Sequence, residues 1–168
     1  MGTCGSAPKV KELKEEISNN KLNAFRDEIL NKHNEIRKSH GSPELTINDY
    51  LNKIAQSYAK QILDSKGQKF FPNNVYNDSS LGENIIISSI KEPKEIFEKW
   101  YNEKNCYDFS LNKFQKGTGH FTQIVWKSTK EVGFGLESDS DNNICCVALY
   151  YPGGNVIGEF SNNVNNIV

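Results

Sequence analysis

Hydrophobic residues recur at helical spacing in three stretches of the chain. In each stretch, apolar side chains lie three or four positions apart, which is the period of a helix that buries one face. The first stretch covers residues 25–36, and the second follows a capping residue at Asn48 or Asp49 and ends at Gly67. The third starts near Pro93, a residue type favoured in the first turn of a helix. We therefore expect three helices that pack against a core.

Patterns typical of strands lie between and after these helices. Residues 85–87 are three consecutive isoleucines, which predicts a buried strand after the turn-rich segment 69–80. Residues 131–151 contain two apolar runs separated by turn-forming residues at 138–143, the pattern of a hairpin. Helices are expected on both sides of the strands in sequence order. This order favours an α/β fold in which helices cover a sheet.

Polar and titratable residues are concentrated between residues 117 and 129, where they are interleaved with apolar positions. Thr118 can cap a short helix in this stretch. The apolar residues on its inward face are Phe121, Ile124 and Val125. His120 falls in the first helical turn, where the helix dipole disfavours an imidazolium and leaves a neutral ring nitrogen as a metal ligand or a base. A hydrogen-bonded structural histidine is the alternative, and spacing alone names no reaction.

Composition limits the functions that this chain can have. Its 168 residues suffice for one domain with a single core, and the 11% of aromatic residues are typical of a folded chain. The net charge of -1 gives no electrostatic basis for binding nucleic acid. The first thirty residues lack the apolar core of a secretory signal, and no run reaches the ~18 apolar residues of a spanning helix. We expect a protein on the cytosolic side of membranes, with an extracellular protein as the alternative.

The cysteines point to the same compartment. They are Cys4, Cys106, Cys145 and Cys146. Adjacent residues of a strand point to opposite faces, and Cys4 lies in a polar tail. We therefore expect free thiols in a reducing compartment and no disulfide framework.

The amino terminus carries a lipidation motif. Residues 1–6 fit the myristoylation pattern, in which Gly2 becomes the first residue and a hydroxyl side chain follows at the favoured position. One myristoyl chain binds membranes only marginally, so a second acyl chain on Cys4 would make the attachment stable. An ordinary polar terminus is the alternative. We expect residues 1–22 to be an acylated tail that tethers a folded domain of residues 23–168.

Several motifs together identify a family. Residues 119–126, Gly-His-Phe-Thr-Gln-Ile-Val-Trp, followed by Thr129, resemble the signature of the CAP superfamily, the cysteine-rich secretory, antigen 5 and pathogenesis-related proteins. A second signature of that family is matched at residues 150–155, Tyr-Tyr-Pro-Gly-Gly-Asn. Three shorter motifs follow the family's order: His33-Asn34-Glu35-Ile36-Arg37, Gly82-Glu83-Asn84 and Trp100-Tyr101-x-Glu103. The resemblance covers about residues 23–163.

This resemblance implies a fold and a cellular location. CAP proteins have a single-domain α/β fold, a three-layer α-β-α sandwich. Secreted members typically carry a cysteine where this chain has Ala148, so the chain looks like the intracellular, Golgi-associated pathogenesis-related branch. That branch is known for membrane attachment and self-association. We therefore expect attachment to the cytosolic face of the Golgi or another endomembrane, and a homodimer.

The resemblance also implies a cleft with two histidines and two glutamates, in which the histidines are able to hold zinc. Residue by residue, Glu83, Glu103 and His120 match three of these positions. The fourth falls in residues 69–72, where Phe70 takes the place of the imidazole. A zinc site needs at least three converging ligands, so we expect no cofactor and only weak binding of zinc or another divalent cation at His120.

The other two histidines match the family's first helix. His33 lies on the apolar stripe of that helix, where a buried structural imidazole is expected. His40 lies near the helix end, where it would interact with the dipole or with water.

Three classes of function remain open. The expected one is a non-enzymatic, membrane-associated module that binds lipid or protein partners, another copy of itself included. The first alternative is a carrier of sterols or fatty acids, as described for secreted relatives. The second is a hydrolase in which His120 is the base, Glu83 or Glu103 orients it, and a Ser or Thr is the nucleophile.

Overall fold

The computed structural model describes the following residues: 10–65, 75–77, 79–89 and 92–168. For residues 10–17 and 75 it describes the backbone alone. The expectations from the sequence for four residues lie outside the described part of the chain: Gly2, Cys4, Gly67 and Phe70.

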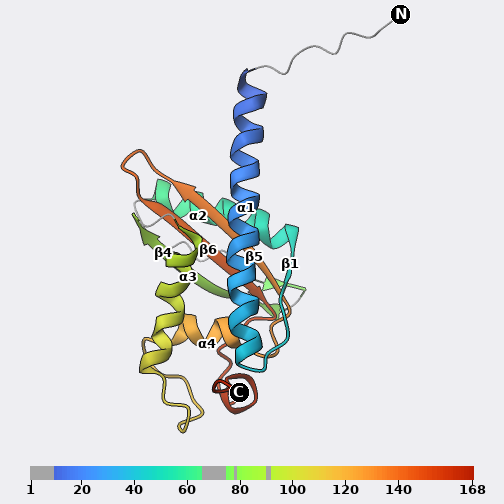
Figure 1. The fold of residues 1–168 in the computed structure, drawn as a ribbon, viewed down its shortest axis with the longest axis vertical. Helices are drawn as coiled ribbons and strands as arrows, with labels where there is room; N and C mark the ends of the chain where they lie inside the picture. Colours follow the sequence, from blue (N-terminus) through green and yellow to red (C-terminus); the bar gives the residue numbers. More distant parts are fainter. Residues whose placement is uncertain (1–9, 66–74, 78, 90–91) are drawn as a thin grey trace, which may run out of the picture.

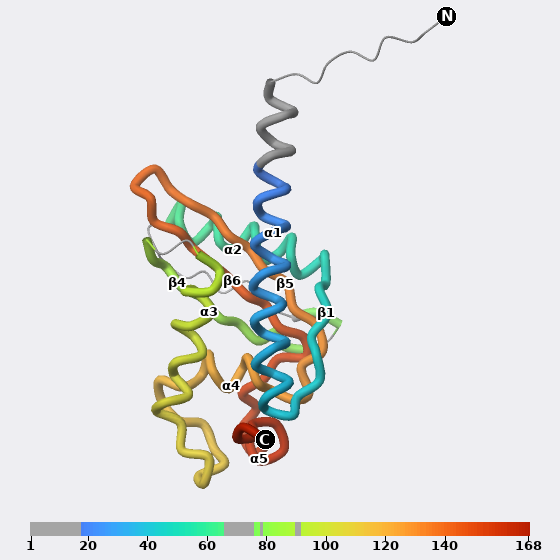
Figure 2. The backbone as a smooth tube through the Cα atoms, viewed as in Figure 1, coloured from blue at the N-terminus to red at the C-terminus, as the bar shows by residue number. Residues whose placement is uncertain are grey.

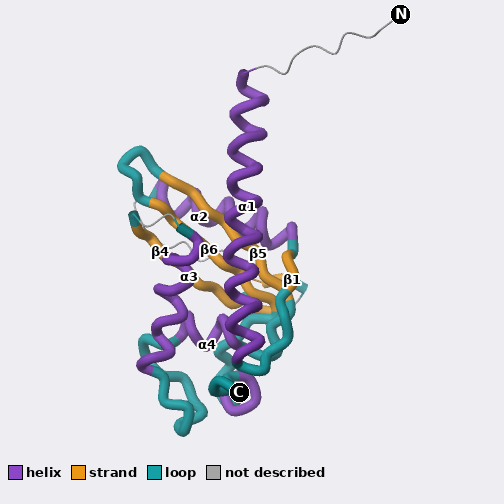
Figure 3. Tube along the Cα trace, viewed as in Figure 1, coloured by secondary structure: helices purple, strands orange, loops and turns teal. Residues whose placement is uncertain are grey.

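A four-stranded sheet forms the middle of the fold (Figure 1, Figure 3). Its strands, in order across the sheet, are β1 (Thr46–Ile47), β5 (Glu131–Ser138), β6 (Ile144–Tyr151) and β4 (Gly82–Ser88). β1 runs parallel to β5, whereas the β5–β6 and β6–β4 pairs are antiparallel. β5 and β6 form the hairpin that the sequence predicts. A separate two-stranded ladder consists of β2 (Val75–Tyr76) and β3 (Ser79–Ser80).

Helices cover both faces of the four-stranded sheet. One face carries α1 (Val10–Ser39), α3 (Pro93–Tyr101) and α4 (Gly119–Val125). The other face carries α2 (Asp49–Asp64). Two short elements complete the described set: the 3₁₀ helix η1 (Asn102–Cys106) and α5 (Phe160–Asn163). Figure 2 follows the chain through these layers, which make up the expected single α/β domain.

α1 extends beyond the sheet at its N-terminal end (Figure 1). Its 30 residues correspond to about 45 Å of helix at 1.5 Å per residue. The boundary predicted between residues 22 and 23 lies inside this helix, so the backbone is helical on both sides of it. None of the described helices has both the length and the apolar composition that crossing a membrane requires.

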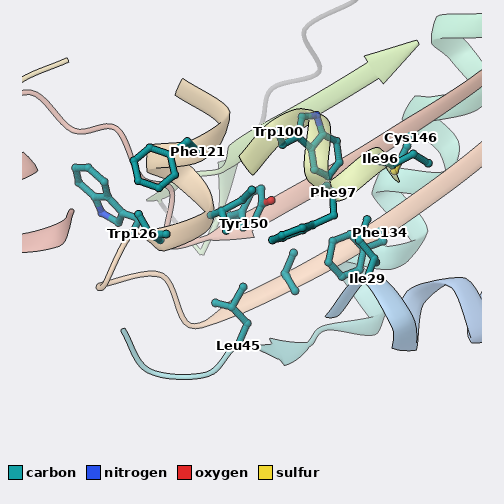
Figure 4. Close-up of a cluster of buried hydrophobic side chains, with 14 of the residues drawn as sticks. Ile29, Leu45, Ile96, Phe97, Trp100, Phe121, Trp126, Phe134, Cys146 and Tyr150 are labelled. Atoms are coloured by element: carbon teal, nitrogen blue, oxygen red, sulfur yellow. The ribbon is translucent and has the colours of Figure 1, made fainter. Parts of the chain in front are cut away.

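Alternate residues of β6 enter two separate cores, because successive side chains of a strand point to opposite faces. Cys146 and Tyr150 lie in the cluster under α1, α3 and α4, whereas Cys145 packs under α2. Figure 4 shows Tyr150 among aromatic side chains of α3 and α4. Cys145 and Cys146 are buried and Cys106 is exposed, and none of these three described cysteines is in a disulfide.

Two details of the predicted elements need correction. The isoleucine run is not a fully buried strand: Ile85 is 9% exposed but Ile87 is 45% exposed. The reason is the place of β4 at the end of the strand order, with a single strand neighbour in its sheet. Second, α2 starts at the predicted Asn48 cap but already ends at Asp64, where Ser65 terminates it.

Candidate functional site

Glu103 and His120 meet at the N-terminus of α4. The predicted capping residue, Thr118, makes no side-chain capping bond, because its hydroxyl donates to the carbonyl of Gln115. The carboxylate of Glu103 replaces it: Oε2 accepts from the backbone N–H of His120 at 2.8 Å and of Phe121 at 3.1 Å. The first turn of a helix has N–H groups without partners inside the helix, and a negative charge there is favourable. α4 is therefore capped by a residue 17 positions earlier in the chain.

The same carboxylate fixes the imidazole of His120. Nδ1 lies 2.7 Å from Oε1 of Glu103. A carboxylate only accepts hydrogen bonds, so Nδ1 carries the proton and Nε2 is the ring atom with a free lone pair. The side chain is 38% exposed, and Nε2 has no hydrogen-bond partner among the described residues. The ring lies 6.2 Å from that of Trp100, measured between centroids. This geometry presents one oriented nitrogen toward solvent.

Glu103 reaches α4 because α3 and η1 are firmly placed. Ile96, Phe97 and Trp100 of α3 are buried in the larger core. At the end of α3, the hydroxyl of Tyr101 lies 3.2 Å from Nε2 of His40. The η1 helix then turns Glu103 toward α4. His40 is thus buried, and both of its ring nitrogens lie within hydrogen-bonding distance of protein groups. The sequence had instead suggested an interaction with the helix dipole or with water.

A buried chain of hydrogen bonds continues from α4 into the core. The amide nitrogen of Asn84 donates to the backbone carbonyl of His120 and to the hydroxyl of Tyr150, both at 3.1 Å. Tyr150 lies 2.8 Å from Nε2 of His33, whose Nδ1 lies 2.7 Å from the carbonyl of Ile29. The carbonyl requires a proton on Nδ1, so Tyr150 donates to Nε2. Burial lowers the pKa of His33 to about 3, and His33 is the structural imidazole that the sequence predicts.

Glu83 lies on the other face of the sheet from Asn84. Strand alternation in β4 directs Asn84 toward α4 and therefore directs Glu83 toward the side of α2. On that side Tyr58 has its pKa raised to about 12, first by burial and then by the charge of Glu83. The structure therefore brings Glu103 and His120 together. The convergence of Glu83 with this pair stays a prediction.

The described residues do not form a metal site. Among them, no group of three His, Cys, Asp or Glu side chains is arranged to hold an ion. His120 Nε2 is the available nitrogen, and the carboxylate behind it resembles the hydrogen-bonded support that metal-binding histidines usually have. One such nitrogen falls short of the three or more ligands of a zinc site. Phe70, the predicted replacement of the second histidine, lies outside the described residues.

The second signature holds α4 from its other side. Asn155 donates from its side chain to the carbonyl of Gly119 and accepts from the hydroxyl of Thr122. Gln123 accepts from the backbone N–H of Gly154 at 2.8 Å. Asn155 has a φ of 61°, a left-handed conformation that Asn tolerates better than most residues. The two signatures therefore form one interlocked unit.

Arg37 is a site residue that reasoning from the sequence missed. It is fully buried, and its guanidinium donates to four backbone carbonyls at 2.7–2.9 Å: Pro43, Ile124, Trp126 and Thr129. These groups include the C-terminal end of α4, where a positive charge is favourable. Burial lowers the pKa of Arg37 to about 10. The available signal was its place four residues after His33 on the apolar stripe of the first helix.

Comparisons with known proteins agree with this geometry. The model of the CAP family, described as the cysteine-rich secretory protein family, matches residues 30–150. The Golgi-associated plant pathogenesis-related protein 1 of Homo sapiens is 40% identical over 143 residues, which cover 83% of this chain and 92% of that protein. Protein PRY2 of Saccharomyces cerevisiae is 39% identical over 145 residues, but they cover only 41% of that longer protein and 83% of this chain.

A solved structure supports the same assignment. The venom allergen-like protein 4 of Schistosoma mansoni superposes with a TM-score of 0.65 at 26% identity, covering 76% of this chain and 88% of that one. The family match spans well over half of the chain and includes Glu83, Glu103 and His120. The chain therefore belongs to the CAP family.

Proposed function

We propose that this protein is a non-enzymatic CAP domain that attaches to the cytosolic face of the Golgi or another endomembrane and binds lipid or protein partners there. The proposal of a non-enzymatic role is based on the hydrogen bonds of the Glu103 carboxylate. It accepts from three N–H groups, two of the backbone and one of the His120 ring. Glu103 therefore holds η1 against α4, and we assign a structural role to the Glu103–His120 pair.

The hydroxyl groups around His120 support the same proposal. A serine or threonine nucleophile needs its hydroxyl within hydrogen-bond reach of the base. The hydroxyl groups between residues 117 and 129 instead bond to other groups. They belong to Thr118, Thr122, Ser128 and Thr129. Within the described residues, none of them bonds to Nε2 of His120. A peptidase assay on the wild type and His120→Ala tests this point, and activity that depends on His120 would contradict it.

Membrane attachment is proposed from the amino terminus and from the relatives. The Gly2 and Cys4 motif supplies two acylation sites, which together give stable anchoring. The human relative carries the words Golgi-associated in its name. α1 begins at Val10 and extends beyond the sheet, so an anchor before it would hold the domain at a distance from the bilayer (Figure 1).

Cell fractionation tests the attachment. Wild type is expected in the membrane fraction, Gly2→Ala in the soluble fraction, and Cys4→Ser in both, because one acyl chain binds reversibly. Thr3→Ala is a matched control that leaves both acylation residues in place. Intact mass of the purified protein reports the acyl chains directly. Membrane binding of Gly2→Ala equal to that of wild type would refute the proposed anchor.

A lipid carrier is the second candidate, and one groove favours it. The groove lies between α1 and α3, has a volume of about 330 Å³, and is lined with apolar surface by Ile36, Phe97 and Tyr101. Charged residues at its rim are Lys32, Glu35 and Glu98. Small-molecule sites are typically clefts of about this size or larger. Binding of labelled fatty acids or sterols that is lost in Ile36→Glu, with the fold intact, would support a carrier.

A further inference from the structure

One edge of the sheet is closed by side chains in place of a strand. β1 pairs with β5 only at Glu131 and Val132, so none of the described strands pairs with the rest of β5 on that side. Before the last residue of β5, Ser138, the backbone groups that point outward belong to Phe134 and Leu136. Unpaired N–H and C=O groups along an edge are a template for pairing with another chain.

Every one of these four groups has a side-chain partner. Asn52 accepts from the N–H of Phe134 at 2.8 Å, and Nε of Arg26 donates to its carbonyl at 2.9 Å. The amide of Gln56 bonds to both groups of Leu136, accepting at 3.0 Å and donating at 2.8 Å. A primary amide has the same donor and acceptor as a peptide group. Gln56 therefore replaces one residue of a neighbouring strand.

Two glycines allow α2 to come close enough for this arrangement. A Cβ at Gly133 would collide with the backbone of Leu51 and Asn52, and a Cβ at Gly135 would collide with the backbone of Ala55. Both positions face α2, because they alternate with Phe134 and Leu136. Asn52 and Gln56 are one helical turn apart, so both reach the same edge. Arg26 approaches from α1, on the opposite face of the sheet.

An open groove lies beside this edge. It has a volume of about 290 Å³ and contains Gln56, Leu136 and Glu137, with Lys21 and Leu22 of α1 on its other wall. The edge is also self-complementary in an antiparallel arrangement centred on Gly135. That arrangement places Phe134 of one copy opposite Leu136 of the other, and each pair exchanges two backbone hydrogen bonds.

We infer that Arg26, Asn52 and Gln56 form a lock on the edge of β5 that prevents a second copy of this chain from pairing with it by strand addition. The occupant of the open edge is the same edge of another copy, which gives a closed two-fold dimer. Arg26 bonds to only one of the four outward backbone groups, the carbonyl of Phe134. Asn52 and Gln56 of α2 bond to the other three groups and therefore account for most of the lock.

The variant Asn52→Ala/Gln56→Ala tests the lock, because alanine keeps α2 helical while removing the side chains from the edge. Light scattering over a concentration series is expected to show association beyond the oligomeric state of the wild type at the same concentration. Lys53→Ala/Lys60→Ala changes two exposed positions of the same helix and is expected to stay like wild type. Ile62→Val, a core change in α2, controls for loss of stability alone.

Amide hydrogen exchange shows whether the association uses this edge. In Gln56→Ala, the amide of Leu136 is expected to lose protection by tenfold or more while that of Phe134 keeps it. In the dimer of the double variant, both amides are expected to be protected again. A folded double variant that keeps the oligomeric state of the wild type at every concentration would overturn the inference, and so would association in which these two amides still exchange fast. The single variant decides the role of Gln56 even if the double variant does not fold.

Discussion

The carboxylate of Glu103 bonds to His120 twice, at the backbone N–H and at the ring Nδ1, with distances of 2.8 and 2.7 Å. One side chain therefore caps α4 and sets the tautomer of its histidine. The Nδ1 edge of the ring is thereby fixed toward Glu103, by a contact between residues 17 positions apart in the chain. The capping of α4 and the tautomer of His120 therefore both depend on Glu103, and two substitutions of this residue can separate them.

Glu103→Gln is expected to change the tautomer of His120. The amide oxygen still accepts from the backbone N–H groups, but the amide nitrogen then faces Nδ1 and donates to it. The proton moves to Nε2, which nitrogen chemical shifts of the imidazole report. Glu103→Ala removes the cap as well and is expected to lower the free energy of unfolding by about 1–3 kcal/mol. An unchanged tautomer in Glu103→Gln would show that the carboxylate does not set it.

Arg37→Met is expected to be among the most damaging single substitutions in the chain. It removes one donor from each of four buried carbonyls, of which that of Trp126 still accepts from the N–H of Thr129. Each carbonyl left unsatisfied costs about 1–3 kcal/mol. We expect a loss of about 3 kcal/mol or more in urea unfolding. Arg37→Lys keeps the charge but has three donors in place of five, so its loss is expected to be smaller. Equal stability of Arg37→Met and wild type would contradict this account.

His33 is expected to make the protein sensitive to acid. Its pKa is about 3 in the folded protein because of burial, against 6.5 for the ordinary side chain. Above pH 6.5 the His33 side chain is neutral in both the folded and the unfolded protein. Between pH 6.5 and 3 only the unfolded state takes up the proton, so folding stability falls as the pH falls. The slope is about 1.4 kcal/mol per pH unit, and the total loss at pH 3 is about 5 kcal/mol.

Urea unfolding of wild type and His33→Gln between pH 7 and 4.5 measures this contribution. The variant is less stable at pH 7, but its stability is expected to fall less steeply with acid. Other groups, His40 among them, titrate in both proteins and cancel in the comparison. Parallel curves for the two proteins would show that His33 takes up its proton in the folded state.

Periodicity was enough to predict the helical segments that pack on the sheet, the hairpin and the burial of His33, because these depend on residues close together in the chain. It did not show that α1 already begins at Val10. It was not enough for β4. An isoleucine run has the same appearance in a central and in an edge strand, and only the strand order distinguishes them. Strand alternation alone was enough to predict that Cys145 and Cys146 point to opposite faces of the sheet, and the two side chains do enter different cores.

The polar contacts of the site were mostly beyond prediction from spacing. Without the family resemblance, Glu103 would be interpreted as a solvated helix charge, since the groups it bonds lie 17 and 18 residues later. Arg37 bonds across 87 to 92 residues to carbonyl groups, which no side-chain pattern reveals. Thr118 had the right residue type for a cap, but a stronger acceptor from another element occupies that place.

The last prediction concerns zinc at His120. The orienting carboxylate of Glu103 leaves Nε2 as a good single ligand, yet a zinc site requires at least three. We predict weak zinc binding by the wild type and no hydrolytic turnover. Phe70 matches the position of the family's second histidine, so Phe70→His is expected to strengthen zinc binding measured by titration calorimetry. Phe71→His, one position away, is the matched control and is expected to give no gain. The gain should disappear in Phe70→His/His120→Ala, since that variant lacks the oriented nitrogen. Micromolar or tighter binding by the wild type that is lost in His120→Ala would show instead that the site is complete without a second imidazole.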